Sequence, residues 1–145
     1  MTNTNQEKKD YLIRYRDNER EIRRLQNEIQ RWKDSAYITS VKYTGAGGGT
    51  DGQDKLQVNV ERLVRLQNRL TAQMRARIQL RDEIEDAIES VPDDRLQLLL
   101  RYRYIEGWRL EKIAVEWNYD YRWVRRLHGR ALEKLTLESP LSSVL

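Results

Sequence analysis

Two long stretches of the chain repeat apolar residues at helical spacing, and this repeat restricts the possible folds more than any other feature. Between about Gln6 and Ala36 the apolar residues follow a seven-residue repeat in two series, Tyr15, Ile22, Ile29 and Ala36, and Tyr11, Leu25 and Trp32. From Asp54 to about Glu89, apolar residues recur at steps of three and four. Such patterns are typical of long helices that pack along one face against a partner helix.

The segment between these stretches is rich in glycine and predicts a connection. It contains β-branched Thr39, Val41 and Thr44, followed by five glycines within eight residues. We expect residues 39–53 to form a flexible loop, with Asp54 capping the second helix and Gln57 as its reciprocal partner. Residues 47–52 also match the glycine spacing of a dinucleotide site, but such a site needs a second parallel strand, which the sequence does not show.

The two long helices are expected to pair as a hairpin spanning residues 1–90. Each is about 45 to 55 Å long, so they can lie antiparallel across the loop. Because two helices alone bury little apolar surface, we expect a second copy of the hairpin or the C-terminal part of the chain to cover it. A homodimer is the favoured arrangement, with partner binding as the other role of the hairpin. Asn18 falls on the apolar seam, where it would fix register or be solvated at a frayed end; solvation is the favoured reading.

Three short helices are predicted for residues 91–137. Residues 90–94 stop the second long helix, and Pro92 in the first turn starts the next one, which ends at Gly107. Its inward residues are expected to be Leu96, Leu99, Leu100 and Tyr104. Residues 138–145 lack a clear period and are expected to form a mobile tail.

The following segment has the pattern of two helices around a tight turn. Residues 110–117 place Ile113, Ala114 and Trp117 on the inner face, and the small Ala114 permits a close helix crossing. Asn118 occupies the turn position that usually needs a positive backbone φ. Asp120 is placed to cap the next helix. This is the layout of a helix-turn-helix that inserts a helix into the DNA major groove.

The helix predicted from Tyr121 to Leu135 has apolar and basic residues on opposite faces. At 100° per residue, its apolar residues lie within about 80° of arc; they are Val124, Leu127, Ala131 and Leu135. The helix has five basic residues and one acidic residue, a net charge of +4 that equals that of the whole chain. Gly129, in the middle of the basic face, would let the backbone approach a partner closely.

Arginine pairs with guanine or with phosphate, so the basic face predicts contact with double-stranded DNA. The candidate contact residues are Tyr121, Arg122, Trp123, Arg125, Arg126 and Arg130. Two other readings stay open: the face is the solvated side of an ordinary bundle helix, and Trp123 packs at the edge of a small core instead of against DNA.

Other classes of function find little support in the sequence. The chain has no cysteine, and its single histidine, His128, lies on the apolar side of the last helix, where we expect it at the edge of the core. The acidic residues are spread over solvated helix faces. We therefore predict no catalytic residue, no metal and no cofactor. No apolar run long enough to span a membrane and no secretion signal are present, so the expected location is the cytoplasm.

The runs Glu106 to Ala114 and Val124 to Leu135 also carry a family resemblance. Over about 30 residues without a gap, this part of the chain resembles region four of bacterial sigma factors, which binds the minus-35 promoter element. The resemblance implies that Tyr121, Arg122, Arg125 and Arg126 are recognition-helix contacts, with Arg130 on the DNA backbone. Residues 118–120 and Trp123 depart from the family pattern, so the resemblance does not carry over a base preference.

The layout of the whole chain resembles small regulators encoded by phages and mobile elements of Gram-positive bacteria, which are grouped with phage late-gene activators. Together these features predict a sequence-specific DNA-binding transcriptional regulator, with the hairpin setting dimer geometry or contacting RNA polymerase. A DNA-packaging adaptor of the small-terminase type is one alternative. A coiled-coil interaction module that does not bind DNA is the other.

Overall fold

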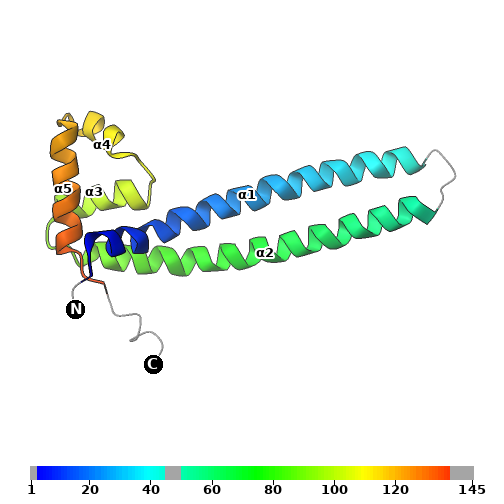
Figure 1. Ribbon diagram of the computed structural model, residues 1–145, viewed down its shortest axis with the longest axis horizontal. Helices are drawn as coiled ribbons and strands as arrows, with labels where there is room; N and C mark the ends of the chain where they lie inside the picture. The colour runs from blue at the N-terminus through cyan, green and yellow to red at the C-terminus, as the bar shows by residue number, and fades with distance from the viewer. Residues whose placement is uncertain (1–2, 45–49, 138–145) are drawn as a thin grey trace, which may run out of the picture. The chain divides into compact units, whose positions relative to one another are not determined.

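The computed structural model describes residues 3–44 and 50–137, and this part of the chain is all-helical. The long helices α1 (Asn5–Thr44) and α2 (Thr50–Glu89) run antiparallel, and α3 (Asp94–Tyr104), α4 (Leu110–Trp117) and α5 (Tyr121–Lys134) follow (Figure 1). The predicted fold class is confirmed. None of the described helices combines the length and apolar character needed to span a membrane. The predicted tail, residues 138–145, lies outside the described residues.

The helices extend further into the predicted loop than the sequence indicated. α1 continues to Thr44 and α2 begins at Thr50, so Asp54 lies inside α2 and does not cap it. A β-branched residue costs a helix at most about 0.7 kcal/mol, and lengthening an existing helix needs no new nucleus. The expectation of a loop over all of residues 39–53 is therefore wrong, and what remains of it, residues 45–49, lies outside the described residues.

The chain divides into two compact units. Unit 1 comprises the described residues of Met1–Asp17 and Arg77–Leu145, and unit 2 comprises Asn18–Ala76. The boundary that the sequence suggested, at residue 90, lies inside unit 1. The reason is that the first turns of α1 and the last turns of α2 pack with the three short helices.

The core of unit 1 joins α3, α4 and α5 to the ends of the two long helices. Leu12 of α1 and Ile84 and Ile88 of α2 are completely buried in the same cluster as Ile113 and Val124. The four residues of α3 that were expected to face inward are all buried. The C-terminal helices thus cover the apolar surface of the long helices within unit 1.

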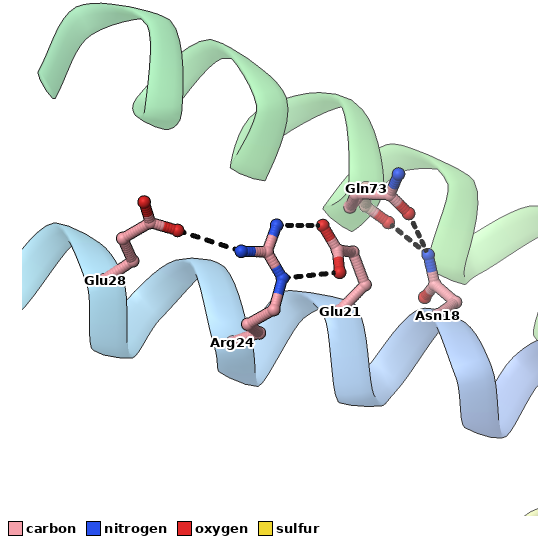
Figure 2. A network of polar contacts seen from close by, with 5 residues as sticks. All are labelled: Asn18, Glu21, Arg24, Glu28 and Gln73. Carbon is pink, nitrogen blue, oxygen red and sulfur yellow. Dashed lines mark hydrogen bonds and ion pairs between the residues drawn. The ribbon is translucent and has the colours of Figure 1, made fainter. Parts of the chain in front are cut away.

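Unit 2 has a narrower apolar seam, which includes a buried amide. Leu25, Ile29 and Leu66 form its buried cluster. Asn18 is also buried, and its Nδ2 donates to the backbone oxygen of Gln73 at 3.0 Å and to that residue's Oε1 at 2.8 Å (Figure 2). The expectation that Asn18 is solvated is wrong, because α1 is intact at this position. A register-setting role is the reading that agrees with the contacts.

Figure 2 also shows Arg24 between Glu21 and Glu28 along the same helix, with nitrogen–oxygen distances of 2.7 and 2.9 Å. These side chains are partly exposed, from 27% for Glu28 to 52% for Arg24, so each pair adds about 0.5 kcal/mol or less to the stability of α1. The buried amide of Asn18, and not this exposed network, therefore distinguishes one alignment of α1 and α2 from another.

α3 begins after Asp93, whose carboxylate accepts from the backbone N–H groups of Arg95 and Leu96 at 2.9 and 3.1 Å. Pro92 therefore precedes the capping residue, and its predicted place in the first helical turn is wrong. Because the Asp93 carboxylate satisfies two of the free N–H groups, the helix starts later than expected.

The turn after α3 requires glycine. Gly107 has a φ of 77°, a conformation that residues with a side chain rarely adopt, and a Cβ at this position would also displace the flexible guanidinium of Arg16. The adjacent Trp108 stacks on Tyr102 with ring centroids 4.4 Å apart, and its backbone N–H donates to the Tyr102 carbonyl. These contacts fix the path of the chain from α3 into α4.

A buried lysine holds the C-terminal end of α5. The ammonium of Lys8 donates to the backbone oxygens of Leu132 at 2.7 Å and Glu133 at 3.2 Å, and the residue is 7% exposed. These carbonyls lie in the last turn of α5, at the negative end of the helix dipole. The Leu132 carbonyl also accepts from the backbone N–H of Leu135 at 3.2 Å. Lys8 thus links the first helix of the chain to the last one.

Replacing Lys8 with Met should lower the free energy of unfolding by about 1 to 3 kcal/mol, because the apolar stem is kept and two charge-assisted hydrogen bonds are lost. Urea denaturation followed by circular dichroism measures the change. Lys33→Met is the control, since Lys33 is an exposed lysine of the same helix. Equal stability of the two variants would contradict a specific role for Lys8.

Candidate nucleic-acid interface

The turn between α4 and α5 has the geometry that the sequence predicted. Asn118 is left-handed, with φ 57° and ψ 45°, and the backbone N–H of Tyr119 returns to the carbonyl of Ala114 at 2.9 Å. Asp120 then caps α5 through a 3.0 Å hydrogen bond from the N–H of Arg122. The expectations for Asn118 and Asp120 are confirmed, and Ala114 is buried as expected. The turn therefore fixes the angle between α4 and α5.

α5 separates apolar and basic residues as expected. Its predicted apolar residues Val124, Leu127, Ala131 and Leu135 are all buried, and Leu132 joins them. Arg122, Arg125, Arg126 and Arg130 are all exposed. We call these four residues the arginine face. The helix ends at Lys134, one residue earlier than predicted, with Leu135 as its C-terminal cap.

The two aromatic residues at the start of α5 lie beside this face. Tyr121 is 38% exposed and Trp123 is 36% exposed. The guanidinium of Arg125 lies 5.9 Å from the Tyr121 ring centroid, and that of Arg130 lies 5.2 Å from the Trp123 ring centroid. Each ring therefore lies within cation–π distance of one arginine of the arginine face. All six candidate contact residues lie on the exposed side of one helix within unit 1.

The arginine face is not neutralised by acidic side chains. Among the described residues, none of its four arginines forms an ion pair, whereas Arg14 and Arg101 elsewhere in unit 1 pair with Glu83 and Glu85. Arg122, Arg125 and Arg126 line a shallow hollow of about 400 Å³. Guanidinium groups placed in this way have their donors free for a base edge or a phosphate.

His128 lies behind the arginine face, in the core, as predicted. It is 7% exposed, and its Nε2 lies 2.8 Å from the hydroxyl of Tyr104. Burial, together with the positive charges of Lys9 and Arg103, lowers the pKa of His128 from 6.5 to about 4. Burial also raises the pKa of Tyr104 to about 12. At neutral pH the pair is therefore uncharged and connects α3 with α5.

A cleft next to the arginine face was not identified from the sequence. It encloses about 500 Å³, and Lys9 of α1, Arg103 of α3 and Arg125 of α5 are among its lining residues, as is Arg109 at the start of α4. The sequence offers no signal for it, because Lys9 is one of many charged residues on a long helix. Within residues 3–44 and 50–137, no three histidine or acidic side chains are grouped so as to hold a metal ion.

Comparisons of this chain with protein-family models, with curated proteins and with solved structures give no match. The geometry of α4, α5 and the surface around them is thus the basis for a functional proposal.

The depressed pKa of His128 predicts a dependence of stability on pH. The unfolded chain takes up a proton near pH 6.5 and the folded chain only near pH 4, so the stabilisation is complete above pH 6.5 and is lost as the pH falls toward 4. The loss should reach about 3 kcal/mol. Urea denaturation at pH 7, 6, 5 and 4, compared with His128→Gln, isolates the contribution. Parallel curves for both proteins would contradict it.

Proposed function

We propose that the chain is a non-enzymatic, cytoplasmic regulator of transcription that reads double-stranded DNA with α5. One observation carries the proposal: the arginine face has no acidic partner among the described residues and projects from a helix whose start is fixed by Asn118 and Asp120. The resemblance of the same segment to region four of sigma factors agrees with this proposal.

The dimensions of α5 suit the major groove. Its 14 residues give a helix of about 21 Å, and the groove, about 12 Å wide, accommodates one α-helix. Gly129 places no side chain in the middle of the exposed side, and the space that a Cβ would occupy there is open, with no atom within 4 Å. A duplex can therefore approach the backbone of α5 closely.

The side chains of α5 have distinct roles in this proposal. Arg122, Arg125 and Arg126 lie together around one hollow near the N-terminal end of the helix, and we assign base contacts to them. Arg130, one turn further along, contacts the DNA backbone. Tyr121 and Trp123 are exposed enough to pack against a deoxyribose or a thymine methyl group.

We further propose that unit 2 pairs two copies of the chain. An exposed apolar stripe runs along α2 at four-residue steps, with Leu56, Val60 and Val64 at 37%, 49% and 48% exposure, and Met74 continues it. Because unit 2 buries only a narrow seam of its own, a second copy of this stripe is the partner that would cover it. A dimer presents two α5 helices to a DNA site with two half-sites.

Selection of bound sequences from random duplexes with the full chain tests the function. The expected result is enrichment of a motif that occurs as two repeated half-sites. A small-terminase-like adaptor would instead assemble as a ring-sized oligomer in solution. Failure to retard any duplex would leave the coiled-coil interaction module as the remaining reading, and would overturn the proposal.

Arg126→Ala should weaken binding to the selected site by about 1 to 3 kcal/mol and relax the preference at one base position. Fluorescence anisotropy with the selected duplex and with single-base variants of it measures both effects. Arg31→Ala, which removes an exposed arginine of unit 2, is the control and should bind like the unchanged protein. An unaltered base preference in Arg126→Ala would remove Arg126 from the set of reading residues.

The double variant Val60→Lys, Val64→Lys should be monomeric, because it places two like charges on the stripe. The matched control is Val58→Lys, Ala72→Lys, which adds the same charge on exposed positions away from the stripe. Sedimentation velocity distinguishes the two, with the control remaining a dimer. If both double variants keep the mass of the unchanged protein, the stripe is not the interface.

A further inference from the structure

The cleft beside the arginine face collects positive charge from four separate segments of unit 1. Lys9 of α1, Arg103 of α3, Arg109 before α4 and Arg125 of α5 all line it. One acidic residue, Glu111, lines it as well. Lys9 and Arg103 lie far apart in sequence, so the fold, and not a local run of basic residues, creates this concentration of charge.

The positive charges of the cleft exceed the single negative charge of Glu111, and none of them is held in an ion pair within the described part of the chain. None of the four basic side chains has an ion-pair partner there, and Glu111 is unpaired too. Arg103 contacts its surroundings through a 3.4 Å hydrogen bond to the Trp108 carbonyl and through the face of the Tyr104 ring. An anion would therefore find charged donors on several sides of the cleft.

Two more features of the cleft favour an anion. α4 begins here with Arg109 as its N-terminal cap, and no side chain of the described residues accepts from the first N–H groups of that helix. These groups carry the positive end of the helix dipole. His128 also lines the cleft, and burial, together with the positive charges of Lys9 and Arg103, lowers its pKa.

We propose that this cleft is a binding site for a phosphate group, held by Lys9, Arg103 and Arg109. Phosphate fits because its oxygens accept several charge-assisted hydrogen bonds at once from guanidinium and ammonium donors. The volume, about 500 Å³, is also large enough to hold a small molecule that carries the phosphate.

The cleft shares Arg125 and Tyr121 with the candidate reading surface, so its ligand bears on DNA binding. The phosphate belongs either to the backbone of a duplex docked on α5, which rests on the proposed function, or to a free phosphorylated molecule. In the first case Lys9 brings α1 into contact with the DNA. In the second case the ligand competes with DNA for Arg125.

The test uses the only histidine of the chain as its probe, because the imidazole proton signals of His128 are unique in the NMR spectrum. The full chain is titrated with pH in the presence and absence of inorganic phosphate at constant ionic strength. A nearby anion favours the imidazolium, so bound phosphate should raise the pKa of His128 by about 1 or more. The response should saturate with phosphate concentration.

The double variant Lys9→Gln, Arg109→Gln removes two phosphate donors that lie outside the candidate reading set, and it should bind phosphate at least about tenfold more weakly. Lys55→Gln, Arg31→Gln is the matched control, with the same change of charge in unit 2. No response of His128 to phosphate, or an equal response in the two double variants, would overturn the site.

The selected duplex then identifies the source of the phosphate. If the Lys9 and Arg109 variant also binds the duplex more weakly, with a salt slope reduced by about 0.9 for each lost contact, the DNA backbone supplies it. If phosphate binding is lost and duplex binding is unchanged, a free phosphorylated molecule is the ligand. A chain that binds no duplex but keeps the phosphate response retains this site and loses the proposed function.

Discussion

The apolar side of α5 determines what the rest of this surface can do. Val124, Ala131 and Leu132 are almost completely buried against the other helices of unit 1, and burying each of the larger side chains contributes about 1.5 to 3 kcal/mol. The arginines on the opposite side repel one another at helical spacings, but such repulsion costs only about 0.2 to 0.5 kcal/mol per pair. Burial therefore decides the rotation of the helix about its axis, and the arginine face is exposed as a consequence.

Polar contacts at both ends of α5 also hold the helix in this orientation. At the N-terminal end, Asp120 caps α5 and Asn118 fixes the turn before it. Beyond the C-terminal end, the N–H of Thr136 donates to the hydroxyl oxygen of Ser90 at 2.9 Å, and that hydroxyl donates to the Ala87 carbonyl at 2.6 Å. Together with Lys8, these bonds hold α5 against both long helices. A helix supported in this way loses little conformational freedom when it binds a rigid partner.

The parts of the structure that the sequence predicted correctly are those determined locally. The conformation of Asn118 and the capping by Asp120 depend on residues within one turn, and the faces of α5 follow from helical periodicity. The bond from Lys8 to Leu132 joins residues 124 apart, and no pattern in the sequence marks it. The cleft is likewise formed by residues far apart in the sequence, so no local pattern marks it. Residues 39–44 belong to α1 and not to the predicted loop, because their low helix propensities cost less than the continuation of a long helix gains.

The basic residues of the arginine face and of the adjacent cleft form no ion pair with the described acidic residues. The chain has 23 acidic residues for 27 basic ones, so partners for arginine are plentiful. In unit 1, three arginines of the long helices and α3 pair with glutamates: Arg14, Arg81 and Arg101. On the arginine face and in the adjacent cleft, no described basic side chain is paired in this way. Arg95 and Lys112 of unit 1 also lack an ion pair among the described residues, so what distinguishes α5 is that four exposed arginines lie on one face of a single helix. An anionic partner of the kind proposed above would supply the negative charge that these four arginines lack within the chain.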